Sequence, residues 1–147
     1  MNRIIEQGTA LKQRIENAAA AISSCHRGAP PETALILGTG LGAVVDEISD
    51  AVTLPYGEIP GFPVSTAPGH EGQLHIGQLS GTRVIAFEGR FHLYEGWNMD
   101  DIGMPMRVAC RLGISSAIIT NACGGMNQEL QKGDLLILDD HINLLGA

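Results

Sequence analysis

The sequence predicts an α/β protein with a mixed central β-sheet flanked by helices. Short apolar runs of strand length recur along the chain, several end in glycine-rich or polar segments, and other segments carry apolar residues at helical spacing. The 147 residues are 44% hydrophobic and 17% charged, which is typical of a soluble globular protein. We therefore expect residues 1–147 to lie within a single domain.

The first third of the chain predicts a helix, a strand and a glycine-rich turn. Residues 33–37 form an apolar run with the length of a buried strand, and the proline-containing segment 28–31 separates it from the residues before. Three glycines within 38–42 predict a turn that leads into a short helix over 43–48. Residues 3–24 are predicted to form an amphipathic helix, because apolar or small residues recur every three or four positions, at Ile4, Gly8, Leu11, Ile15, Ala18 and Ile22.

The middle of the chain predicts a strand, an irregular loop and a hairpin. A strand-like segment around 52–54 is followed by a loop with prolines at 55, 60, 63 and 68, and so long a loop is typically functional or mobile. Residues 73–79 and 82–87 are rich in apolar side chains and flank a Ser-Gly pair. We expect these two segments to form antiparallel strands joined by a tight turn.

The last third predicts one helix and two more strands. Asn98 suits the N-cap of a helix that ends at Gly113, and two aspartates follow it where the helix dipole favours negative charge. Residues 116–120 and 135–138 are short apolar runs, so both are predicted to be buried strands. The buried face of the helix is expected to consist of Ile102, Met106, Ala109 and Leu112.

Charge and cysteine content exclude several classes of protein. The net charge is −7 and only nine residues are basic, which argues against a general nucleic-acid binder. No apolar stretch has the length of a membrane span, and the N-terminus lacks the features of a signal peptide. The three cysteines, Cys25, Cys110 and Cys123, lack metal-ligand spacing. We expect a reduced cytoplasmic protein without a metal site, in which Cys123 is a small buried residue.

The most informative segment for function is residues 89–96, which follow an apolar strand-like run. In an extended chain, alternate side chains point to the same side, and Phe91 and Leu93 are then expected to face the core. Arginine presents a fork of donors that matches phosphate, histidine supplies another donor, and a tyrosine ring offers a flat apolar surface. The pattern predicts a site for an anion next to a sugar, formed by Arg90, His92 and Tyr94.

Three predicted strands end in polar or glycine-rich loops, after Leu37, Phe87 and Thr120. Ligands of open α/β sheets lie at the carboxyl ends of strands, so these loops are expected to meet at one site. The first loop would offer backbone N–H groups and the Thr39 hydroxyl to an anion, close to a helix N-terminus.

The same glycine loop, at 38–43, also fits the loose dinucleotide pattern G-x-G-x-x-A. The acidic residue at the expected distance, Glu58, lies in the proline-rich loop and not at a strand end. No lysine follows the loop, which excludes a P-loop for nucleoside triphosphates. A dinucleotide-binding Rossmann domain is therefore a minor alternative.

Six segments in order along the chain resemble the trimeric class of purine nucleoside phosphorylases. These are GTGLG at 38–42, YGEIPGFP at 56–63, PGHEG at 68–72, GRFHLYEG at 89–96, NACGG at 121–125 and DHIN at 140–143. The resemblance implies a nucleoside phosphorylase fold. It also implies a pentosyltransferase activity: inorganic phosphate cleaves the N-glycosidic bond of a purine nucleoside, releasing the base and ribose 1-phosphate.

The resemblance also implies roles for individual residues. Tyr94 would contact the ribose, and His70 would lie on a mobile loop over the phosphate. Inorganic phosphate would be a co-substrate, with no other cofactor, and no covalent protein nucleophile is needed because catalysis is mainly positioning and electrostatics. The residues implied to bind phosphate are Thr39, His70, Arg90, His92 and the backbone at Ala122.

Residues 1–147 resemble only the N-terminal half of the longer family domain, and the family's base-recognition residues lie in the other half. Two accounts follow. In the first, the chain is part of a phosphorylase and is inactive alone. In the second, it is a non-catalytic binding or assembly module, whose exposed sheet edge invites pairing. The resemblance further implies a homotrimer that binds a purine nucleoside and phosphate, while charge and hydropathy predict no nucleic acid or membrane partner.

Overall fold

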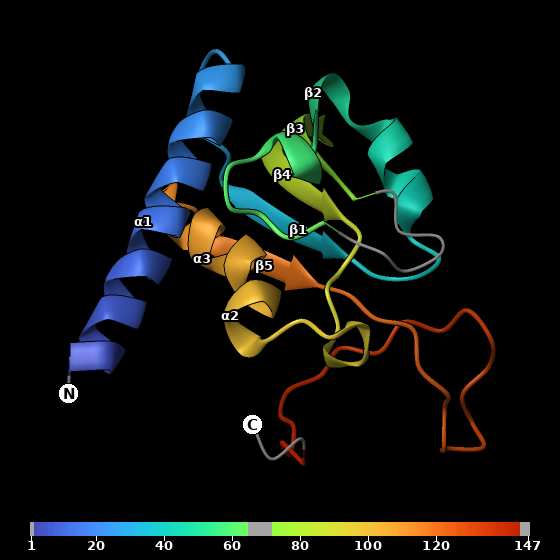
Figure 1. Cartoon of the computed structure of the whole chain (residues 1–147). Coiled ribbons are helices and arrows are strands. Elements are labelled where there is room, and N and C mark those ends of the chain that lie inside the picture. Colours follow the sequence, from blue (N-terminus) through green and yellow to red (C-terminus); the bar gives the residue numbers. More distant parts are fainter. Residues whose placement is uncertain (1, 65–71, 145–147) are drawn as a thin grey trace.

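The structure, a computed structural model, describes residues 2–64 and 72–144 (Figure 1). Its described part contains a five-stranded mixed sheet in the order β2-β3-β4-β1-β5. The hairpin β3/β4 and the pair β2/β3 are antiparallel, whereas β1 is parallel to both β4 and β5. The strands are β1 (Thr33–Leu37), β2 (Ser49–Pro55), β3 (Gln73–Leu79), β4 (Thr82–Glu88) and β5 (Ser116–Ile119).

The helices lie mainly on one face of this sheet. Helix α1 (Asn2–Cys25) packs beside α3 (Met104–Arg111), and the short α2 (Met99–Ile102) precedes α3 (Figure 1). As the spacing predicts, α1 turns Ala18 and Ile22 into the core. The N-terminal helix and the two helices between β4 and β5 thus cover the same side of the sheet.

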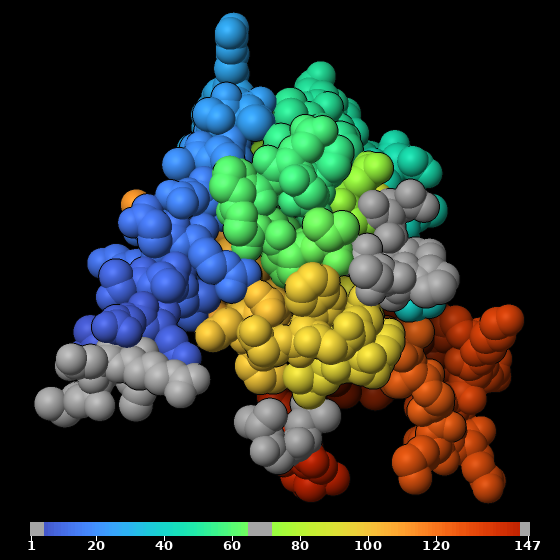
Figure 2. Space-filling model, viewed as in Figure 1, coloured from blue at the N-terminus to red at the C-terminus, as the bar shows by residue number. Residues whose placement is uncertain are grey.

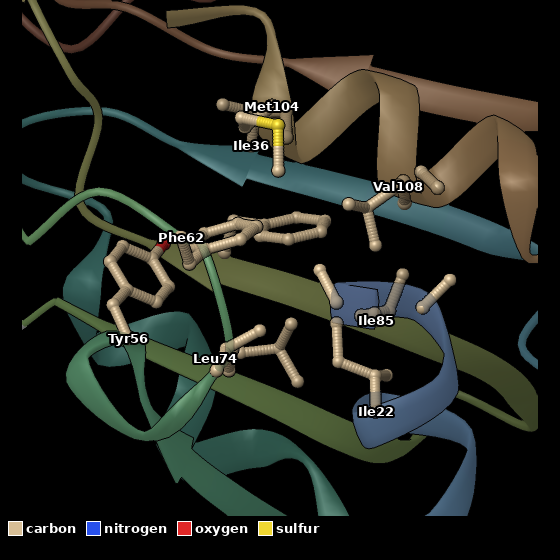
Figure 3. Close-up of a cluster of buried hydrophobic side chains, with 14 of the residues drawn as sticks. Ile22, Ile36, Tyr56, Phe62, Leu74, Ile85, Met104 and Val108 are labelled. Atoms are coloured by element: carbon tan, nitrogen blue, oxygen red, sulfur yellow. The ribbon is translucent and has the colours of Figure 1, made fainter. Parts of the chain in front are cut away.

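The main core lies between these helices and the sheet (Figure 3). It joins Ile22 of α1, Met104 and Val108 of α3, and side chains from one face of the strands. Burial of such apolar surface is the principal force that holds the layers together. The labelled strand residues in this core are Ile36, Leu74 and Ile85.

The opposite face of the sheet carries a smaller core, formed by Leu35, Leu37, Ile48, Val84 and Ala86. A 3-10 helix over Gly42–Glu47 covers it with Val44 and Val45. Alternate residues of β1 therefore face two apolar layers, as expected for a strand buried on both sides. The predicted short helix after the glycine turn is confirmed as this 3-10 helix.

The predicted hairpin is also confirmed, because β3 and β4 pair antiparallel along their whole length. Its turn uses Ser80 and Gly81, both with positive φ, at 49° and 81°. Such angles in two successive residues are characteristic of the tight turn that matches the twist of a hairpin.

Five aromatic side chains form a connected group within and against the main core. Neighbouring rings have centroids 5.0 Å apart for Tyr56 and Phe62, and 6.0 Å apart for Phe91 and Trp97. Tilted and edge-on arrangements at such distances are favourable for aromatic rings. The group links the loop after β2, the end of β4 and the segment before α2 through Tyr56, Phe62, Phe87, Phe91 and Trp97.

The predicted helix after Asn98 is two helices. The Asn98 side chain caps α2 by accepting the N–H of Asp101 at 3.0 Å, as predicted, but α2 ends after one turn at Gly103. Pro105 lies in the first turn of α3, where its missing N–H does no harm. Of the predicted buried face, Ala109 is buried, and Ile102, Met106 and Leu112 are only partly buried against the core. Met104 and Val108, which the sequence pattern does not place on that face, are fully buried.

Three further sequence predictions are wrong in the C-terminal part. Strand β5 exists but is exposed along its length, residues 135–138 form no strand, and Cys123 is exposed. Strand β5 is an edge strand paired only with β1 among the described residues, and Figure 2 shows residues 121–144 projecting from the body. Burial requires a covering layer as well as apolar side chains.

No helix in residues 2–64 and 72–144 is long and apolar enough to cross a membrane.

Candidate anion site at the ends of the parallel strands

The carboxyl ends of β1, β4 and β5 lie together at one end of the sheet, here called the carboxyl edge, because the three strands are parallel (Figure 1). In the ladder, Leu37 of β1 is opposite Glu88 of β4, and Ile36 is opposite Ile119 of β5. The loop 38–42, the segment from Gly89 and the segment from Thr120 therefore start side by side. This confirms the prediction that the loops after these strands meet.

The first loop is fastened to the end of β5. The N–H of Gly38 donates to the Thr120 hydroxyl oxygen at 2.9 Å, and that hydroxyl donates to the Ile36 carbonyl at 3.0 Å. A Cβ on residue 38 would lie 2.7 Å from the Thr120 carbonyl oxygen and 3.0 Å from the Cα of Asn121. Glycine is required at 38 because two backbones pass so closely there.

A small cavity of about 30 Å³ lies at this junction, lined by residues 37–40, Gly42, Glu88 and Gly89. It is large enough for a water molecule but too small for a nucleoside. Thr39 is exposed, as the predicted contact between its hydroxyl and an anion requires. The Gly38 and Leu41 N–H groups, however, already bond to Thr120 and to the Gly38 carbonyl, so the loop offers fewer donors than expected.

The segment after β4 is extended only as far as His92. Residues Leu93–Glu95 then form a 3-10 turn that closes at Gly96, where φ is 90°. Phe91 is buried as predicted, but Leu93 is 41% exposed, so its predicted place in the core is wrong. The turn removes the alternation on which that prediction depended, and Tyr94 is 79% exposed.

Glu95 determines the orientation of His92 in this turn. One Glu95 carboxylate oxygen accepts the His92 backbone N–H at 3.0 Å and lies 2.7 Å from the ring Nδ1. The His92 ring also stacks on Tyr94, with centroids 4.6 Å apart and planes 17° from parallel. A carboxylate on one ring nitrogen fixes the ring and its tautomer. Glu95 is not among the residues predicted from the sequence, although its spacing of three from His92 is that of a capping box.

Arg90 is positioned from the core below it. The buried Tyr56 hydroxyl donates to the Gly89 carbonyl at 3.0 Å, and Phe91 packs against the Tyr56 ring at 5.4 Å. The residues on both sides of Arg90 are thereby anchored, while Arg90 itself is half-buried. Burial raises the pKa of Tyr56 well above its usual value, with a further contribution from the charge of Glu88, so the phenol stays a neutral donor.

A second polar network, also missed from the sequence, lies beside the cavity. His75 Nε2 is 3.0 Å from Glu88 Oε2, and His75 Nδ1 is 3.0 Å from the Thr53 hydroxyl. The His75 and Glu88 side chains are only 9% and 15% exposed. The signal in the sequence is a carboxylate at the end of an apolar strand, directly before the Gly-Arg pair at 89–90.

Two predicted phosphate ligands remain, Ala122 and His70. Ala122 follows β5 by way of Thr120 and is exposed at the same edge of the sheet. His70 lies outside the described residues. The structure thus brings Thr39, Arg90 and the chain leading to Ala122 to one sheet edge.

The fold does not support the dinucleotide interpretation of the glycine loop. That interpretation requires a strand, a helix and a parallel neighbouring strand in succession. Here β1 leads into a 3-10 helix and then into β2. Strand β2 is the edge strand on the side of the sheet away from β5, and it pairs antiparallel with β3.

Comparison with known proteins shows the family to which the chain belongs. Residues 32–147 match the phosphorylase superfamily. Purine nucleoside phosphorylase 1 of Bacillus subtilis is 52% identical over 137 residues, which are 93% of this chain and 50% of the relative. A Schistosoma mansoni purine nucleoside phosphorylase in complex with inosine is 38% identical with a TM-score of 0.74, covering 83% of this chain and 42% of that one.

A second solved structure of a relative contains a sugar phosphate. Isoform 2 of the Schistosoma mansoni enzyme, in complex with cytosine and ribose-1-phosphate, is also 38% identical, with a TM-score of 0.75 over 83% of this chain and 42% of that one. The chain spans about half the length of the relatives it matches. The mixed sheet with flanking helices agrees with the predicted fold class, although part of the relatives' fold has no counterpart here. From its sequence match and its fold, the chain belongs to the phosphorylase superfamily, as part of a domain like those of purine nucleoside phosphorylases.

Proposed function

We propose that this chain supplies the phosphate-binding part of a purine nucleoside phosphorylase. The observation that carries the proposal is the meeting of three parallel strand ends, which places the Thr39 loop, Arg90 and the segment of Ala122 at one edge. The 52% identity to a purine nucleoside phosphorylase supports the same conclusion. The proposed reaction cleaves the N-glycosidic bond of a purine nucleoside with phosphate.

The residue types at this edge suit the proposed reaction. The guanidinium of Arg90 can bind two phosphate oxygens at once, and the Thr39 hydroxyl and the Ala122 backbone can add single hydrogen bonds. His92, oriented by Glu95, adds a further contact from the same segment. The sugar develops positive charge as the glycosidic bond breaks, so a phosphate held beneath it stabilises that charge and then attacks.

Tyr94 is the proposed ribose contact. It is exposed, and its ring is held in place by stacking on His92 instead of by burial in the core. A flat ring beside the anion site can cover one face of a sugar. His70 is proposed as another phosphate ligand.

Several features remain predictions for the whole protein. Base recognition is proposed to come from the part of the relatives that this chain does not cover. A homotrimer, a cytoplasmic location and the absence of any cofactor besides phosphate are likewise predicted.

The activity is tested by following inosine phosphorolysis with the 147-residue chain and with a full-length protein that contains it. We expect turnover from the full-length protein and none from the chain alone, because half of the relatives' length is uncovered. Robust turnover by the short chain would show that the second half is dispensable. No turnover by either would favour a binding or assembly module.

The site is tested by titrating phosphate into the full-length protein by calorimetry. Arg90→Ala should weaken phosphate binding about tenfold or more, the effect of losing a charged hydrogen-bonding group. Arg107→Ala is the matched control, because Arg107 pairs with Asp100 on the helical side and its loss changes the net charge equally. Equal effects of the two substitutions, or binding of NAD in place of phosphate, would refute the assignment.

A further inference from the structure

We propose that Glu88 selects the anion bound at this site, by accepting a hydrogen bond from the acidic proton that phosphate carries and sulfate lacks. The inference rests on the proposed function, because it takes the anion site for a phosphate site. Glu88 is thus a specificity-determining residue, and His75 and Thr53 position it.

The position of the carboxylate is the first argument. Glu88 is the last residue of β4 and lines the cavity together with Gly38, Thr39 and Gly42. Its Oε1 lies 3.1 Å from the place where a Cβ on Gly42 would be, so this oxygen faces the glycine loop. An anion that contacts the loop from this cavity would lie close to Oε1.

The rigidity of the carboxylate is the second argument. The other oxygen, Oε2, is 3.0 Å from His75 Nε2, and the opposite ring nitrogen is 3.0 Å from the Thr53 hydroxyl. The ladder explains this alignment: Thr53 is opposite His75, His75 is opposite Ala86, and Glu88 lies two residues further on the same face. Three adjacent strands thus prevent Glu88 from turning away toward solvent.

The chemistry of an ionised carboxylate is the third argument. It only accepts hydrogen bonds, so it repels an anion that has no proton to donate. Near neutral pH, inorganic phosphate and arsenate keep at least one acidic proton, whereas sulfate keeps none. Discrimination among ligands commonly relies on such a repulsive element beside the attractive ones. Arg90 attracts all three anions, and Glu88 rejects the one that cannot donate.

The test compares phosphate, arsenate and sulfate by calorimetry on the full-length protein at neutral pH. The wild type should bind phosphate and arsenate similarly and sulfate about tenfold or more weakly, the effect of one unfavourable charged contact. Glu88→Gln supplies an amide that can donate, so sulfate affinity should rise and the phosphate-to-sulfate ratio should fall toward one. His75→Gln should lower the ratio partially, because Glu88 loses its support.

Glu47→Gln is the matched control. Glu47 is an exposed carboxylate on the 3-10 helix that covers the same face, so its loss changes the net charge without touching the cavity. The anion ratio should not change in this variant.

The outcomes separate the two proposals. An unchanged ratio in a folded Glu88→Gln protein that still binds phosphate overturns this inference and leaves the proposed function standing. Failure of the wild type to bind phosphate overturns the proposed function and this inference with it. If Glu88→Gln does not fold, the wild type decides, because equal affinity for sulfate and phosphate refutes the selection.

Discussion

Strands β1 and β5 are neighbours in the sheet, run parallel, and have similar apolar sequences, yet their environments are opposite. Ile36 and Ile119 are ladder partners, and they are 7% and 61% exposed. Strand β1 has a strand on each side and apolar layers on both faces, whereas β5 has one described neighbour. An apolar run can therefore select strand geometry without being buried, because burial depends on what covers the strand.

The residues after β5 extend this contrast. Leu135 and Ile137 are as apolar as the residues of β1, but they find no ladder partner in the described chain and remain exposed without regular structure. A strand requires a neighbour to accept its backbone hydrogen bonds. The relatives are about twice as long as this chain, so their further residues are the natural source of such a neighbour.

The largest expected difference comes from truncating the two ladder partners. Ile36→Ala should lower the free energy of unfolding by about 2–5 kcal/mol, because it leaves a cavity in the main core. Ile119→Ala should change it by less than about 0.5 kcal/mol, since the side chain is exposed. Urea denaturation of the 147-residue chain measures both.

Equal losses would show that β5 is covered in solution. In a full-length protein whose additional residues pack on β5, the loss for Ile119→Ala should approach that for Ile36→Ala, and a persistent gap there would contradict our account of the contrast.

The next effect concerns the place where the two strands meet. Gly38→Ala should lower stability by about 1–3 kcal/mol, because the new Cβ would collide with the backbone at Thr120 and Asn121. Gly8→Ala is the control: apart from the backbone of its own helix and its chain neighbours, no described atom lies within 4 Å of the new Cβ, so stability should rise by about 0.5–1 kcal/mol. Thermal melts of both variants test the pair, and a neutral Gly38→Ala would rule out the close approach.

A smaller loss of stability is expected from removing the Tyr56 hydroxyl in the main core. Tyr56→Phe should lower stability by about 1–2 kcal/mol, because the buried Gly89 carbonyl loses its donor. Burial raises the pKa of Tyr56, so the unfolded phenol ionises first and stability should fall as the pH rises above about 10. The variant should lack that part of the alkaline decline. Tyr94→Phe, on an exposed ring, should keep it, and urea titrations at several alkaline pH values distinguish the two.

The smallest effect concerns the hydroxyl that joins the strand ends. Thr120→Val should lower stability by about 0.5–1.5 kcal/mol, because the Gly38 N–H and the Ile36 carbonyl each lose a hydrogen bond. Amide hydrogen exchange at Gly38 should accelerate. Thr120→Ser, which retains the hydroxyl, should restore protection, and identical exchange in both variants would argue that the hydroxyl plays no part.

Local patterns predicted most of the sheet. The bounds of β1 and β3 match the apolar runs, and the Ser-Gly turn fixes the hairpin, because these elements depend on alternation and turn chemistry within a few residues. The exposure of β5 and of Cys123 could not be read in this way. It depends on which segments pack against them, and sequence periodicity does not encode that.

In the candidate site, too, some features follow from local sequence and others depend on contacts between distant segments. The meeting of the three loops followed from the parallel strands, and the types of Arg90 and His92 pointed to an anion. The turn at Leu93–Glu95 and the Glu88–His75–Thr53 network did not follow. The first depends on one carboxylate capping a short turn, and the second on side chains from three strands that only the ladder register brings together.

The order of strands in the sheet has a consequence for how the chain acquires this fold. Thr33 at the start of β1 is the ladder partner of both Val84 and Ser116, so this inner strand is synthesised first and its two neighbours, β4 and β5, much later. While the chain grows on a ribosome, β1 has no partner until β4 emerges, whereas the hairpin β3/β4 can close as soon as it is complete. Folding is thus expected to begin at the hairpin and to recruit β1 afterwards, and the end of the sheet where β1, β4 and β5 meet is assembled last.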